Sequence, residues 1–66
     1  MDTPIVVIIP AGTGYFQEYN GNINGDFRRA TEDITTDFEL YHGASVIFKL
    51  PSGKRGITQR SLVRIE

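Results

Sequence analysis

The sequence predicts an all-β fold, a small barrel built from short strands. Short apolar or alternating segments recur along the chain, and each is bounded by glycine, proline or asparagine turn signals. No segment carries a convincing long helical pattern, and the chain of 66 residues suffices for one small domain without repeats or linkers. Successive short strands at this spacing are typical of small β-barrels.

The first predicted strand is the β-branched block Ile5–Ile9, which lies between Pro4 and Pro10. Consecutive β-branched residues disfavour a helix and suit a strand that is buried on both faces. The two prolines fit the ends of a strand, where no ladder donor is lost. We therefore expect the chain to open with a strand over these residues.

Residues 11–26 are rich in glycine and asparagine. The pairs Asn20-Gly21 and Asn24-Gly25 are strong signals for turns with positive φ angles. We therefore expect a long Gly/Asn-rich loop or an irregular hairpin after the first strand. Because so long a structureless loop is unusual in a small domain, a short strand is expected near Tyr15–Tyr19, with an exposed tip at Asn20–Gly25.

Residues 31–41 admit two interpretations. Alternation places one apolar-rich set on a single face of a half-buried strand, namely Ile34, Thr36, Phe38 and Leu40. The alternative is a helix capped by Thr31 or Thr35 and stopped by Gly43. Threonine and aspartate are poor interior helix formers, which favours the strand but leaves the helix open.

The C-terminal third contains three further predicted strands. Ala44–Leu50 alternates, Pro51–Lys54 forms a turn, Arg55–Gln59 is a short strand, and Leu62–Ile65 closes the chain. The predicted core combines the inward residues of all strands: Ile5, Val7, Ile9, Phe38, Leu40, Val46, Phe48, Ile57, Leu62, Val63 and Ile65.

The segment Ser52–Ile65 resembles the closing segment of SH3 domains, and KOW and Tudor-type domains end comparably. In this resemblance Gly56-Ile57 begins the fourth strand, Arg60–Leu62 forms a one-turn 3₁₀ helix, and Val63–Ile65 is the last strand. Upstream, Glu39–Gly43 looks like the turn in which an acidic residue and a leucine precede a glycine. The resemblance implies a five-stranded SH3-like barrel. It does not imply polyproline binding, because the tryptophan that the SH3 ligand groove needs is missing.

Charge is distributed unevenly along the chain, whose net charge is −1. Residues 1–48 hold seven acidic residues against Arg28 and Arg29, which gives −5, and residues 49–66 hold five basic residues against Glu66, which gives +4. One interpretation is solubility with pairing of opposite charges across strands. The other is a basic face that binds phosphates.

From the basic residues we expect a small non-enzymatic binding module that contacts nucleic acid or a nucleoprotein through a basic C-terminal hairpin. The candidate residues are Lys49, Lys54, Arg55, Arg60 and Arg64, which Arg28 and Arg29 could join. Tyr15, Phe16 or Tyr19 could stack on unpaired bases. The isoelectric point of about 5.7 counts against a dedicated nucleic-acid binder.

The alternative is a protein–protein interaction module, such as an accessory or inhibitor protein of phage or plasmid type that docks on a larger complex. Its candidate residues are Tyr19, Asp33, Asp37 and Glu39. A homodimer that completes the small core is a further expectation.

Other function classes find little support in the sequence. The chain has no cysteine, and its one histidine, His42, has no spacing partner for a catalytic triad or a metal site. Gly12-Thr13-Gly14 and Gly53-Lys54 do not form a phosphate-binding loop. We expect no enzyme activity, cofactor or metal. The apolar run Ile5–Ile9 is far shorter than the ~20 residues of a membrane helix, and Asp2 precedes it, so we expect a soluble cytoplasmic protein without a secretory leader.

Overall fold

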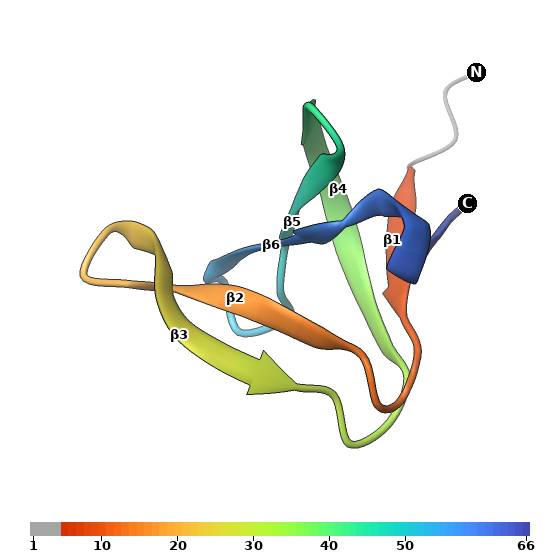
Figure 1. Ribbon diagram of the computed structural model, residues 1–66, viewed down its shortest axis with the longest axis horizontal. Helices are drawn as coiled ribbons and strands as arrows, with labels where there is room; N and C mark the ends of the chain where they lie inside the picture. The colour runs from red at the N-terminus through yellow and green to blue at the C-terminus, as the bar shows by residue number, and fades with distance from the viewer. Residues whose placement is uncertain (1–4) are drawn as a thin grey trace.

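The computed structural model describes residues 5–66 and confirms the all-β class (Figure 1). Pro4 and Asp2, which entered the predictions for the N-terminal segment, lie outside the described residues. The elements are β1 (Val6–Ile9), β2 (Gly14–Tyr19), β3 (Asn22–Arg29), β4 (Ile34–His42), β5 (Ser45–Lys49), β6 (Arg55–Gln59), the 3₁₀ helix η1 (Arg60–Leu62) and β7 (Arg64–Ile65). None of these elements is a helix with the length and apolarity required to cross a membrane.

The strands form one antiparallel sheet of seven strands in the order β3-β2-β6-β5-β4-β1-β7. Within the described residues the sheet is not closed, so the predicted five-stranded barrel is not confirmed. The edge of β6 is occupied by β2, and the β2–β3 hairpin extends the sheet beyond β6. Figure 1 shows this hairpin projecting from the crossing strands β4, β5 and β6.

The segment after β1 is a hairpin, which corrects the expectation of a long loop. The strand predicted near Tyr15–Tyr19 is confirmed as β2, but the exposed tip is only the Asn20-Gly21 turn, where both φ angles are positive at 50° and 79°. Two successive positive φ angles suit a tight hairpin turn, so the chain returns to the ladder at Asn22. Gly25 is a strand residue instead of a turn residue. A Cβ at this position would overlap the Cβ of Tyr19, so the absence of a side chain at Gly25 allows the two strands to approach closely.

Residues 34–42 form β4, so the strand interpretation of this segment is confirmed and the helix is wrong. Ile34, Thr36 and Phe38 face inward as the alternation predicts. The register then shifts between Phe38 and Leu40. Such a bulge breaks the two-residue period, and Leu40 is consequently exposed instead of buried.

The core confirms most of the predicted set. Val7, Ile9, Val46 and Phe48 are fully buried, and Phe38, Val63 and Ile65 pack against them. The core prediction was wrong for the other four residues: Ile5, Leu40 and Leu62 are exposed, and the half-buried Ile57 lies on the face of β6 opposite to the buried Gly56 and Thr58. Ile5 precedes β1, whose first residue is Val6. Leu62 ends η1, and none of the η1 side chains is buried.

Three further core residues were not predicted, namely Tyr15, Ala30 and Leu50. Two threonines are also buried, and each hydroxyl satisfies a backbone carbonyl. Thr36 donates to the Val7 carbonyl and Thr58 donates to the Gly14 carbonyl, both at 2.8 Å. Because a buried hydroxyl without a partner is costly, these bonds make polar inward positions compatible with the core.

The closing segment follows the predicted boundaries except at the last strand, which was expected over Leu62–Ile65 and is only Arg64–Ile65, because Leu62 ends η1 and Val63 caps it. β6 matches the strand expected over Arg55–Gln59, and η1 lies at Arg60–Leu62, where the family resemblance expects a 3₁₀ turn. β7 then pairs with β1, and the main chains of Val6 and Glu66 exchange two hydrogen bonds of 2.8 and 2.9 Å. The last strand therefore lies beside the first.

The ring of Phe48 is the centre of the core. Phe48 on β5 is the register partner of Gly56 on β6, and its ring fills the space where a side chain at position 56 would lie. A Cβ on Gly56 would be 2.6 Å from Cε2 of Phe48. The ring also makes an edge-to-face contact with Tyr15 of β2, with a centroid separation of 6.1 Å. One side chain thus holds three strands together.

We expect Gly56→Ala to lower the free energy of unfolding by about 1–3 kcal/mol, because the buried Phe48 ring cannot move away from an added methyl group. Urea denaturation followed by circular dichroism measures this loss.

Gly14→Ala is the matched control. Its added methyl group would overlap the ring of Phe27, which is exposed and can rotate toward solvent, so the cost should be clearly smaller. Equal costs for the two variants would contradict the central role of the Phe48–Gly56 contact.

Candidate binding surface

The structure distributes the seven basic candidate residues over the whole sheet. Lys49, Lys54 and Arg55 come together at the end of the β5–β6 hairpin, where Lys49 and Arg55 are register partners. Arg28 and Arg29 lie on edge strand β3, and Arg64 lies on the opposite edge strand β7. Arg60 is on η1. Only the hairpin end therefore gathers three of the seven residues.

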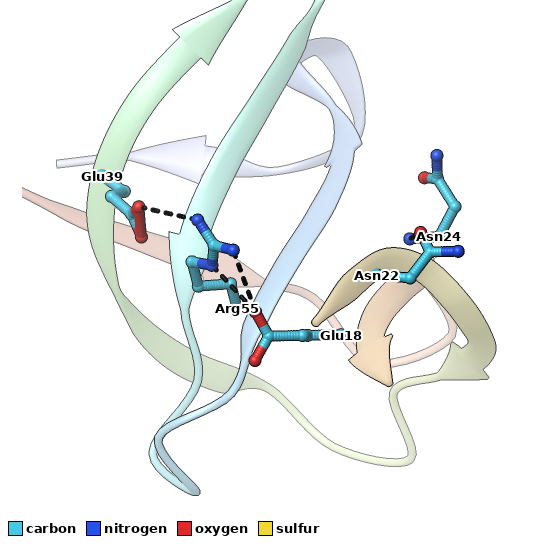
Figure 2. Close-up of polar contacts among 5 residues, drawn as sticks. All are labelled: Glu18, Asn22, Asn24, Glu39 and Arg55. Carbon is cyan, nitrogen blue, oxygen red and sulfur yellow. Dashed lines mark hydrogen bonds and ion pairs between the residues drawn. The ribbon is translucent and has the colours of Figure 1, made fainter. Parts of the chain in front are cut away.

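Two carboxylates from the acidic half of the chain, those of Glu18 and Glu39, flank Arg55 at the end of this hairpin (Figure 2). Arg55, whose side chain is 45% exposed, donates from Nε to Glu18 Oε2 at 3.0 Å, and its Nη2 lies 3.0 Å from the same oxygen. Its Nη1 lies 3.8 Å from Glu39 Oε1. Lys49 is the register partner of Asp37. The acidic and basic halves of the sequence therefore meet across strands, as the cross-strand interpretation of the charges predicts.

Two of the other arginines have an acidic neighbour on their own strand or next to it. Arg28 Nη2 lies 3.7 Å from Asp26 Oδ2, and Arg64 Nε lies 3.4 Å from Glu66 Oε2. Both pairs are exposed, so each contributes little to stability. Their effect is to lower the local positive charge at both edges of the sheet.

The remaining two arginines contact uncharged groups. Arg29 donates from Nη1 to the Gly12 carbonyl at 2.6 Å. The guanidinium carbon of Arg60 lies 4.1 Å from the centroid of the Tyr41 ring, which is a cation–π geometry. Tyr41 in turn packs on Phe38. Arg60 therefore covers an aromatic cluster on β4.

The acidic candidates do not form one continuous surface. Asp33 accepts a hydrogen bond from the backbone N–H of Ala11 at 2.9 Å. Asp37 and Glu39 lie on β4 opposite the basic residues described above. Tyr19 is exposed at the end of β2, beside the hairpin turn. These acidic residues thus mainly face partners within the domain and do not present an acidic strand for docking.

A row of apolar residues crosses five neighbouring strands on the outer face of the sheet. Successive register partners on β3, β2, β6, β5 and β4 form this apolar row: Phe27, Phe16, Ile57, Ile47 and Leu40. Direct cross-strand partners point to the same face. Since Val46 and Phe48 alternate with Ile47 and face the core, the row lies on the opposite face. Phe27 is 56% and Phe16 is 42% exposed.

A groove of about 380 Å³ follows the β3, β2 and β6 part of this row. Its apolar walls are Phe16, Phe27, Ile57 and Leu62, and the rings of the two phenylalanines meet edge to face at 5.3 Å. Amides and hydroxyls, among them Gln59, form the polar part of the lining. None of the described lining residues carries a charge. We refer to this feature as the apolar groove.

Sequence reasoning missed the apolar groove. It assigned Ile57 to the core and considered Phe16 only as a stacking residue, and it singled out neither Phe27 nor Ile47 for binding. The signal was partly visible, because Ile47 opposes Val46 and Phe48 in the alternation of β5. The decisive step is the register, which brings together residues that are as far apart in sequence as Phe16 and Ile57.

Comparisons with protein-family models, with curated proteins and with solved structures gave no match. Within residues 5–66, no three histidine or acidic side chains lie in an arrangement that would hold a metal ion. The function of the chain is therefore inferred from its own surface.

We expect Arg55→Gln to lower the free energy of unfolding by about 1 kcal/mol or less at low salt, because the guanidinium and its partners are only partly buried. The loss should shrink in about 1 M salt, where the Debye length is only about 3 Å. Urea denaturation at both salt concentrations measures it. Arg64→Gln, in the exposed pair on β7, should have a smaller effect. A loss of several kcal/mol that is independent of salt would contradict this description.

Proposed function

We propose that the chain is a non-catalytic protein-binding module that holds an extended apolar segment of a partner protein in the apolar groove. The observation that carries this proposal is the exposure of Phe16 and Phe27 in a groove with an uncharged lining. Contiguous exposed apolar surface of this kind is typical of interaction sites.

The groove has the composition of a protein-binding site more than that of a phosphate-binding site. Aromatic side chains provide large apolar area with few rotatable bonds, so little conformational entropy is lost on binding. The two rings already lie edge to face beside each other in the groove, with a centroid separation of 5.3 Å. The neutral amide of Gln59 and the hydroxyl of Ser45 at the groove suit the backbone groups of an extended peptide.

Nucleic-acid binding through Lys49, Lys54 and Arg55 is the second candidate function. The observation that favours it is the grouping of these three residues at one end of the β5–β6 hairpin. Phosphates there would compete with Glu18 and Glu39 for Arg55, which is the reason for its second rank.

We further propose that β1, β4, β5, β6 and β7 correspond to an SH3-like barrel, with the β2–β3 hairpin inserted after the first strand. Two observations support this correspondence. The five strands are neighbours in the order β6-β5-β4-β1-β7, and η1 lies between the last two strands in the sequence. An experimental structure that separates β1 from β7 would contradict it.

The protein-binding proposal is tested by selecting ligands from a random peptide library and mapping the selected peptides by amide NMR. We expect peptides rich in apolar residues, with shifts at the amides of Phe16, Phe27 and Ile57 and an affinity that changes little with salt. Phe27→Gln should weaken binding about tenfold or more, since it removes an exposed aromatic contact.

Ile5→Gln is the matched control, because Ile5 is similarly exposed but lies outside the groove, and its affinity should stay unchanged. Single- and double-stranded oligonucleotides are titrated in parallel. Salt-sensitive shifts confined to residues 49–55, without peptide binding, would replace the proposal by the second candidate function.

A further inference from the structure

Strand β3 is an edge strand whose outer side has no partner among the described residues. The backbone N–H of Ala30 donates to the Thr13 carbonyl, so the polar groups of Ala30 point toward the β2 side. In an antiparallel ladder these directions alternate along the strand. The N–H and C=O groups of Asp26 and Arg28 therefore point toward β2, and those of Phe27 and Arg29 point outward.

The side chains of this edge carry a self-complementary pattern. Asp26 and Arg28 lie on one face, where their charged groups are 3.7 Å apart and are 37% and 58% exposed. Phe27 lies between them in the sequence and projects from the other face, where its ring contacts Phe16. A negative, an apolar and a positive residue thus follow one another on an unpartnered strand.

We propose that β3 pairs antiparallel with β3 of a second copy of this chain, around a two-fold axis that passes through Phe27. In this register Phe27 exchanges both backbone hydrogen bonds with Phe27 of the second copy, as its outward groups allow. Asp26 then lies opposite Arg28 of the second copy, and Arg28 lies opposite its Asp26. Two ion pairs across the axis reinforce the backbone hydrogen bonds.

Charge selects this register over its neighbours. The same outward backbone groups would also permit an axis at Asp26 or at Arg28. The axis at Asp26 places this residue opposite Asp26 of the second copy, and the axis at Arg28 places it opposite Arg28 of the second copy. Like charges in direct opposition destabilise a strand pair. Only the axis at Phe27 places unlike charges opposite each other among these three registers.

The proposed contact is short, so the association is weak. The β2–β3 register shifts between Gln17 and Tyr19, which limits the regular part of the edge to about the segment from Asp26 to Arg29. The opposite edge strand, β7, has two residues and offers still less. Pairing at β3 would set the Phe27 rings of both copies side by side, so that the two apolar grooves adjoin. The inference does not depend on what the groove binds.

The test measures molar mass by sedimentation equilibrium between about 10 µM and about 1 mM, a range that covers weak association. We expect the wild-type chain to approach twice its mass of 7.4 kDa at the upper end. Asp26→Arg or Arg28→Asp replaces both attractive pairs by repulsive ones. Either change should weaken self-association about tenfold to a hundredfold.

A mixture of the two variants provides the decisive arm. The Asp26→Arg chain carries two arginines at these positions and the Arg28→Asp chain carries two aspartates, so a one-to-one mixture should form a heterodimer with about the wild-type affinity. The double variant Asp26→Arg, Arg28→Asp should recover self-association, and it serves if a single variant fails to fold by circular dichroism. The matched controls Arg64→Asp and Glu66→Arg alter a similar ion pair on β7 and should leave self-association unchanged.

A wild-type chain that stays monomeric up to about 1 mM would overturn the proposal. Failure of the mixed variants to associate would do the same, because one β3 strand then carries two arginines and the other two aspartates, so unlike charges lie opposite each other in each of the three registers. Equal weakening by the β7 variants would also overturn it, since β3 would then have no special role.

Discussion

The fold depends on the contact between the ring of Phe48 and the bare Cα of Gly56. A domain of this size buries little apolar surface, and this chain has neither cysteine nor tryptophan to reinforce its core. The ring of Phe48 must therefore serve several strands at once. It is fully buried, and it contacts β6 at Gly56 and β2 at Tyr15. The side of the sheet that carries the β2–β3 hairpin is joined to the rest of the core through this contact.

The same contact determines which face of β6 meets solvent. Gly56 and Thr58 occupy the inward positions of the strand, where the glycine makes room for Phe48 and the Thr58 hydroxyl bonds to the Gly14 carbonyl. Ile57 between them must point outward. There it joins Phe16 and Ile47 in the apolar row. The candidate binding surface is therefore a consequence of how the core is packed.

Local patterns predicted much of the strand layout. The β-branched block of β1, the alternation of β5 and the turn before β6 depend on neighbouring residues alone. The prediction that Leu40 is buried was wrong because a bulge reverses the alternation of β4, and no local signal in the sequence marks this bulge. Strand β3 was not predicted, because Asn24-Gly25 is a typical turn pair. In the structure Gly25 lies within the strand and leaves room for Tyr19 of the opposite strand. The binding surface needed the register of distant strands. Neutralisation of Arg55 by Glu18 and Glu39 likewise depends on partners 37 and 16 positions away in the sequence.

The attachment of the β2–β3 hairpin has a consequence for local opening of the protein. β2 pairs with β3 at five register positions but with β6 at only two, Phe16 with Ile57 and Gln17 with Gly56. The seam between hairpin and body is thus one of the two thinnest parts of the ladder, the other being the two-position β1–β7 pair, and cooperative units of unfolding often follow such boundaries. The apolar groove spans this seam, with Phe27 on one side and Leu62 on the other. A segment bound there would act as a clamp across it, so that occupancy would slow hydrogen exchange of hairpin amides far from any contact with the ligand.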